Sequence, residues 1–220
     1  ETHMKELKYN INNSLKIRNW FNTAKSYISN MIIISRMVTI SLMVWALFSG
    51  GAMAYEEPEY KLLQSNDAYE IRHYKDRLAV QTIQGHGSNS AFRRLFSYIS
   101  GTNETSSKIS MTVPVTQTDQ NGATQMQFYL PQAFTKETAP APSHGSVKLV
   151  TVPGGYYAVV QYSGRSNDKN YQSHAARLKR HLQDAGVKIL GASIKATYNG
   201  PLTPFFMRRN EAIYPIDWQP

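Results

Sequence analysis

The hydrophobic and polar positions between residues 91 and 117 predict a helix followed by a strand. Apolar residues recur there at intervals of three and four, which is one face of a helix: they are Phe92, Leu95, Phe96 and Ile99. Gly101 follows and is expected to end the helix in a left-handed conformation. Along residues 108–115 apolar and polar side chains then alternate, which indicates a half-buried strand. Because Pro114 has no N–H to donate, we expect this strand to lie at an edge or to carry a bulge.

The rest of the chain after residue 54 predicts further short strands and one more helix. The helix covers about 167–184, with Tyr171, Ala175, Leu178 and Leu182 on its apolar face. Strand patterns occur at 61–66, 68–74, 78–85, 123–131, 147–153, 157–164 and 192–198. The segments 78–85 and 157–164 align at an offset of 79 residues, and each leads through Ser-Asn into a helix. This suggests an internal duplication and an α+β fold with two helices on a curved sheet or open barrel.

The N-terminal residues predict export. Arg36 precedes an almost wholly apolar run at 37–48, and Ala52-Met53-Ala54 supplies a small-residue cleavage site. This run is shorter than the roughly 20 residues of a membrane-spanning helix. We therefore expect 31–54 to be a signal peptide, or an N-terminal anchor if it stays uncleaved, and 1–30 to be a leader or an artificial addition. The domain would be 55–220, periplasmic or secreted, or held at the inner membrane by an uncleaved anchor.

Composition and charge narrow the chemistry. The chain has no cysteine, which excludes disulfides, thiolate metal sites and thiol nucleophiles. Its net charge is +9, but from Tyr55 onward there are 18 basic and 13 acidic residues, a net charge of +5. The basic residues are scattered rather than clustered, which argues against a nucleic-acid partner. The sequence also lacks the G-x-S-x-G, H-E-x-x-H and helix-opening G-x-G-x-x-G motifs.

Five segments resemble, in order and spacing, the SOUL family of haem-binding proteins. They are YEIRHY, AFRRLFSYISGTN, KISMTVPV, FYLP and NGPLTPFFMRRNE, and the resemblance runs from about Tyr55 to Ile216. It implies a bacterial, exported family member with a distorted antiparallel β-barrel of two pseudo-symmetric halves, each with one packed helix. It also implies reversible, non-catalytic binding of haem or another tetrapyrrole.

A tetrapyrrole needs an apolar slot for its macrocycle and cations for its two propionates. Candidates for the slot are Phe92, Leu95, Phe96, Ile99 and Met111; candidates for the propionates are Arg93, Arg94, Lys108 and Arg208. Two alternatives stay open. The apolar set is also what a helix uses to pack a core, and the arginines also suit a solvated surface.

His73 is the candidate ligand for the haem iron. It lies in YEIRHY, where the resemblance implies an axial ligand in some family members, and imidazole suits iron. A histidine on an apolar strand face is also a common core or rim residue, so that alternative remains. His86 is a second candidate on the same chemical grounds.

The sequence thus predicts a tetrapyrrole carrier, scavenger or buffer with its groove beside the first helix. A haem-receiving protein is an expected but unknown partner, and the membrane is a partner only through an uncleaved leader. Two rivals remain. One is a small-molecule hydrolase on the same type of domain, which would need a carboxylate of raised pKa in the groove. The other is a module that binds a protein or a lipid.

Overall fold

The computed structural model describes residues 55–85, 89–120 and 122–219. The predicted leader and signal segment, and His86, lie outside these residues. The helices are α2 (Ser90–Ile99) and α3 (Asp168–Asp184). The strands are β1 (Tyr60–Ser65), β2 (Glu70–Tyr74), β3 (Arg77–Ile83), β4 (Val115–Gln120), β5 (Ala123–Tyr129), β6 (Lys148–Val152), β7 (Gly155–Tyr162), β8 (Lys188–Ile189), β9 (Ile194–Thr197) and β10 (Asn210–Asp217).

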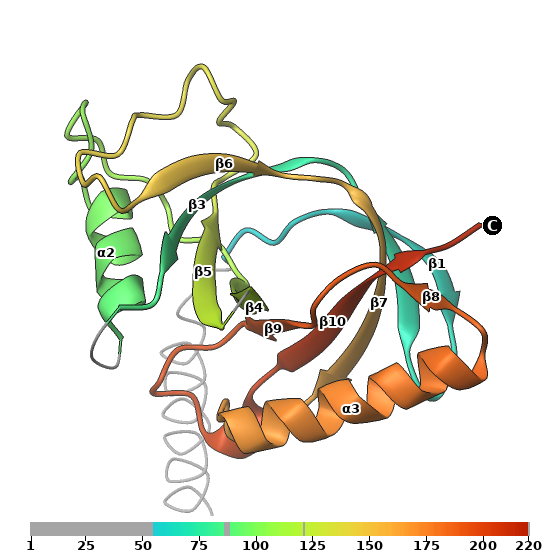
Figure 1. Ribbon diagram of the computed structural model, residues 1–220. Coiled ribbons are helices and arrows are strands. Elements are labelled where there is room, and N and C mark those ends of the chain that lie inside the picture. The colour runs from blue at the N-terminus through green and yellow to red at the C-terminus, as the bar shows by residue number, and fades with distance from the viewer. Residues whose placement is uncertain (1–54, 86–88, 121, 220) are drawn as a thin grey trace, which may run out of the picture. The chain divides into compact units, whose positions relative to one another are not determined.

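The strands form one curled antiparallel sheet with the two helices outside the curl (Figure 1). Its strand order is β1-β2-β7-β10-β9-β4-β5-β3-β6, and β8 pairs with β10. The unit β3-α2-β4-β5 is repeated as β7-α3-β9-β10, and the two units join where β4 pairs with β9. The predicted α+β fold of two pseudo-symmetric halves, each with one packed helix, is therefore confirmed.

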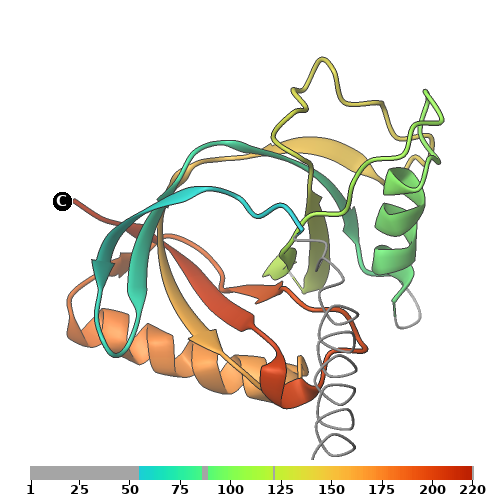
Figure 2. The same cartoon turned by 180° about the vertical axis from the view of Figure 1, so that it is seen from behind.

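The two halves exchange a strand. β2 precedes β3 in the chain but pairs with β7 of the other half, and β6 precedes β7 but pairs with β3. Seen from behind, the same crossing strands enclose the inside of the curl (Figure 2). Each half therefore contributes one strand to the sheet of the other.

Each helix buries one stripe against its own half of the sheet. Leu95, Tyr98 and Ile99 of α2 pack on Val80 of β3 and Phe128 of β5. The helix ends where Gly101 takes a positive φ of 112°, as predicted, and the N–H of Thr102 donates to the carbonyl of Ser97. The left-handed Asn89 occupies the N-cap position of α2 without a side-chain cap hydrogen bond.

The second helix is longer and covers the other half. Ala175, Leu178 and Leu182 of α3 pack on the residues of β2, β7 and β10 that face outward from the curl. Asn167 caps the helix, since its side-chain oxygen accepts from the N–H of Asn170 at 2.9 Å. Within the described part of the chain, neither helix is both long and apolar enough to cross a membrane.

The strand predicted at 108–115 is wrong for most of its length. β4 begins only at Val115, and the preceding residues make a single bridge, between Thr112 and Glu56. Their hydrogen-bonding groups are used elsewhere: the N–H of Ile109 donates to the carbonyl of Ile99, and the hydroxyl of Thr112 to that of Tyr129. The alternation reflected an extended segment that closes the end of the α2 core, not a ladder.

The turn between β6 and β7 depends on a glycine. A Cβ built on Gly154 would lie 2.7 Å from the carbonyl oxygen of Tyr74 and 2.9 Å from the carbonyl carbon of Lys75. The same approach lets the N–H of Gly154 donate to the Asp76 carboxylate at 2.7 Å. The backbone of the β6–β7 turn therefore packs directly against the backbone of the β2–β3 turn.

We predict that Gly154→Ala destabilises the protein by about 1–3 kcal/mol, because backbone cannot yield as a flexible side chain would. Gly145→Ala is the matched control: it is exposed, and its Cβ would meet no described atom within 4 Å. Urea denaturation followed by far-ultraviolet circular dichroism measures both. Equal midpoints for the two variants would contradict the close approach.

Candidate functional site

The helix α2 carries a pair of exposed aromatic rings on one flank. Phe92 and Phe96 lie one turn apart and stack with ring centroids 6.0 Å apart and planes 12° apart. Their exposed fractions are 37% and 50%, although Phe92 also meets the core ring of Phe128 edge-on at 5.2 Å. The helix thus presents a flat apolar surface beside its packed stripe.

The other apolar candidates belong to the core. Leu95 and Ile99 are fully or nearly fully buried under α2, so they support the helix and are not open to a surface ligand in this structure. Met111 is half-buried and packs against the same core. Of the predicted slot residues, only Phe92 and Phe96 form an exposed surface.

The four basic candidates do not converge on one point. Arg93 and Lys108 are exposed, and Lys108 is held near the end of α2 by the hydrogen bond from its neighbour Ile109 to Ile99. Arg94 donates to the hydroxyl of Thr82 at 3.2 Å and the carbonyl of Ile83 at 2.6 Å, which fixes it against β3. On that flank of α2 a cavity of about 190 Å³ is lined by Arg93, Arg94, Ser97, Tyr98, Thr102, Pro142, His144 and Val147.

The remaining basic candidate, Arg208, has a structural role. Its guanidinium donates to the carbonyls of Thr203 and Pro201, both at 2.8 Å, and so holds the loop between β9 and β10.

His73 lies with the α3 half of the sheet. It is half-buried on β2, and its ring stands 4.9 Å from that of Tyr156 on β7, a residue that packs against the α3 core. Phe92 and Phe96 belong instead to the α2 core on β3 and β5. The contacts group His73 away from the phenylalanine pair, and its role as iron ligand stays a prediction.

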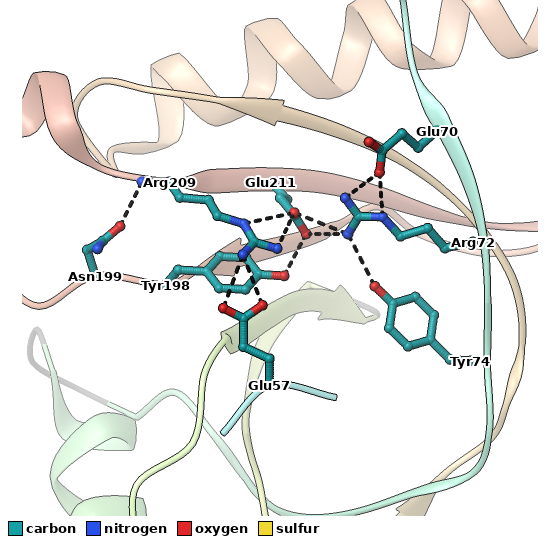
Figure 3. Close-up of polar contacts among 8 residues, drawn as sticks. All are labelled: Glu57, Glu70, Arg72, Tyr74, Tyr198, Asn199, Arg209 and Glu211. Atoms are coloured by element: carbon teal, nitrogen blue, oxygen red, sulfur yellow. Dashed lines mark hydrogen bonds and ion pairs between the residues drawn. The ribbon is translucent and has the colours of Figure 1, made fainter. Parts of the chain in front are cut away.

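A buried ion network fills the inside of the curl (Figure 3). Its centre is Glu211 on β10, which is completely buried. Both carboxylate oxygens accept from Arg72 of β2 at 3.2 Å, Arg209 donates at 3.0 Å, and the hydroxyl of Tyr198 donates at 2.7 Å. Arg72 also pairs with Glu70 at 2.6 Å, and Arg209 with Glu57 at 2.9 Å.

Burial and charge fix the ionisation of this network. Burial by itself lowers the pKa of Arg72. The Glu211 charge and the hydrogen bonds to Tyr74 and Glu70 raise it by more, so its pKa lies above the ordinary value and Arg72 stays charged. Burial and the Glu211 charge raise the pKa of Tyr198, so its phenol keeps the proton that it donates to Glu211. With every oxygen of Glu211 engaged by donors, the arrangement suits a structural clamp better than an acid or base catalyst.

This network was not predicted from the sequence. The signal that could have found it is a charged residue within a strand, such as Arg72 in β2, because a charge that the sheet buries requires a buried partner. Among the described residues, no group of three or more His, Asp or Glu side chains is placed to hold a metal ion.

The curled sheet with one outer helix per half defines an α+β half-barrel fold, and comparison with known proteins identifies the family. Residues 55–215 match the SOUL heme-binding protein family. The chain belongs to this family. It is 30% identical to mouse Heme-binding protein 1 over 129 residues, which are 55% of this chain and 67% of that protein. The family resemblance inferred from the sequence is thereby confirmed.

Two solved structures share the fold. The EcmrR C-terminal domain has a TM-score of 0.52 and 11% identity, and the match covers 72% of this chain and 98% of that one. A hydrolase from Listeria innocua has a TM-score of 0.51 and 10% identity, with 76% and 94% covered. At these identities the likeness concerns the fold alone.

We predict that Arg72→Met destabilises the protein by about 3–5 kcal/mol. The reason is that the buried Glu211 carboxylate loses one of its two arginine partners and keeps only Arg209. The double variant Arg72→Met with Glu211→Leu should regain much of this loss, since no buried carboxylate remains. Urea denaturation gives both free energies of unfolding. Arg93→Met, at an exposed arginine, is the control and should change little; single and double variants of equal stability would contradict the clamp.

Proposed function

We propose that this protein binds haem or a related tetrapyrrole, reversibly and without catalysis, on the exposed aromatic flank of α2, and acts as a carrier, scavenger or buffer. The observation that carries the proposal is the stacked pair Phe92 and Phe96, left exposed beside the buried stripe of α2. Membership of the SOUL heme-binding family supports the ligand class.

The chemistry of the flank fits a flat aromatic ligand. A porphyrin face stacks on phenylalanine rings as other aromatic groups do, and it removes the exposed parts of both rings from water. Arg93 follows Phe92 in the chain and is exposed, so it is free to pair with a propionate carboxylate. Lys108 is the other exposed cation among the candidates. Arg94 would first have to release Thr82 and Ile83.

The proposal does not need an iron ligand. His73 lies with the α3 core, so the flank of α2 offers stacking and charge rather than coordination. Affinity for metal-free protoporphyrin is therefore expected to be close to affinity for ferric haem.

We predict that Phe92→Asp combined with Phe96→Asp abolishes saturable binding of both ferric haem and metal-free protoporphyrin, because a carboxylate in the stack repels the propionates and removes the apolar face. The measurement is a titration of the purified protein, followed by absorbance and tryptophan quenching.

Leu190→Asp is the matched control for this titration. It introduces the same charge at an apolar residue that is 58% exposed and lies beyond β8, and it should bind as the parent does. In the same titration, His73→Ala should leave the Soret band of bound haem unchanged if His73 is no ligand. Normal binding by the folded double variant would reject the α2 flank.

We further propose that the protein is exported, with residues 31–54 as its signal peptide or, uncleaved, as its anchor. The supporting observations are the charge and apolar pattern of that segment, and the start of both the family match and the compact folded unit at Tyr55. Expressed from Met31 in a bacterium, the chain is expected in the periplasmic fraction with Tyr55 as its N-terminal residue. Recovery of the whole chain from the soluble cytoplasmic fraction would contradict export.

A further inference from the structure

The loop between β9 and β10 exposes four large apolar side chains within six residues. Leu202 is 97% exposed, and Phe205, Phe206 and Met207 are 51%, 66% and 66% exposed. Scattered exposed apolar residues are ordinary, but a continuous group of this kind marks a surface that contacts something apolar.

This loop is held in one shape by its own hydrogen bonds. The N–H of Thr203 donates to Gly200 and that of Met207 to Pro204, while Arg208 binds the carbonyls of Pro201 and Thr203. The carbonyl of Phe205 accepts from the N–H of Gly164, at the end of β7. The apolar side chains are therefore displayed by an ordered backbone rather than by a frayed one.

The domain does not cover these side chains itself. An open groove of about 620 Å³ lies between Phe206 and Met207 on one side and Tyr162 and His174 on the other. The surroundings are basic: the guanidinium of Arg165 stands 5.5 Å from the centre of the Phe205 ring, and Arg208 lies in the loop itself. An apolar group bordered by arginines matches the interfacial layer of a bilayer that carries anionic lipids.

The base of the loop is tied to the start of the domain. The N–H of Arg209 donates to the Asn199 side chain at 2.7 Å and so closes the loop, and the Arg209 guanidinium holds Glu57 at 2.9 Å. Glu57 is among the first described residues, so the start of the domain is fixed at the base of this loop.

We propose that Leu202–Met207 is a membrane-contacting loop, which inserts its apolar side chains into the interfacial layer of an anionic bilayer while the exposed guanidinium of Arg165 meets lipid phosphate. This surface lies on a different loop from the aromatic flank of α2, so the proposal does not depend on tetrapyrrole binding.

The test uses the absence of cysteine in the chain. A single Leu202→Cys substitution in the full chain is labelled with a polarity-sensitive fluorophore and added to vesicles of phosphatidylcholine and phosphatidylglycerol. We expect a blue shift and severalfold stronger quenching by brominated lipid than for the control Lys188→Cys. Lys188 is exposed and pairs with Asp217, at the opposite end of β10 from the loop.

A second pair of variants separates insertion from mere proximity. Phe206→Asp added to the labelled chain should reverse the blue shift, whereas Leu190→Asp, at an exposed apolar residue beyond β8, should not. An unshifted probe at Leu202, equal quenching at Lys188, or a shift that survives Phe206→Asp would overturn the proposal. A shift without vesicles that grows with protein concentration would overturn it in favour of contact with a second copy of the chain.

Discussion

The buried carboxylate of Glu211 is the constraint on which the inside of the curl depends. A charge with no exposed surface persists only where donors surround it, and here the donors come from separate parts of the chain. Arg72 reaches it from β2, Arg209 from just before β10, and Tyr198 from just after β9. Because Arg209 also holds Glu57, one carboxylate ties the two sides of the curl to the first residues of the domain.

The residues that stabilise the inside of the curl are therefore distinct from the surfaces proposed to bind a ligand or a membrane. Glu211 is compensated by arginines on both sides, so the most strongly charged part of the interior is already satisfied. Two exposed apolar surfaces lie apart from this network: the phenylalanine flank of α2, and the loop between β9 and β10. The two helices differ in the same sense, since the buried residues of α3 are Ala175, Leu178 and Leu182, whereas α2 places two exposed aromatic rings at the edge of its buried stripe.

Much of the fold could be predicted from the sequence. The periods of the two helices, the glycine that ends the first and the offset between 78–85 and 157–164 together predicted two similar halves, because each is a pattern in the sequence itself. The strand at 108–115 could not be corrected from its alternation, because an extended segment that packs at a helix end alternates in the same way. What decided the matter was where Ile109 and Thr112 place their hydrogen bonds, and those partners are distant in sequence.

The candidate site was predictable only in part, for a related reason. Helical spacing placed Phe92, Leu95, Phe96 and Ile99 on one face, but it could not tell which of the four the sheet would cover. The structure divides them into a buried pair and an exposed pair. The network around Glu211 depends on a pairing between β2 and β7 that no local pattern contains.

The exchange of β2 and β6 between the halves has a consequence for how the molecule comes into being. Arg72 of β2 lies opposite Tyr157 of β7 in the strand ladder. β10, the last described strand, lies in the middle of the sheet between β7 and β9. Pairings so distant in sequence close large loops, which makes folding slow relative to a chain with local contacts. During synthesis the first half cannot complete its part of the sheet, because β3 lacks β6 and β2 lacks β7. The half-barrel is therefore closed only when β10, the last strand of the described residues, has joined the sheet.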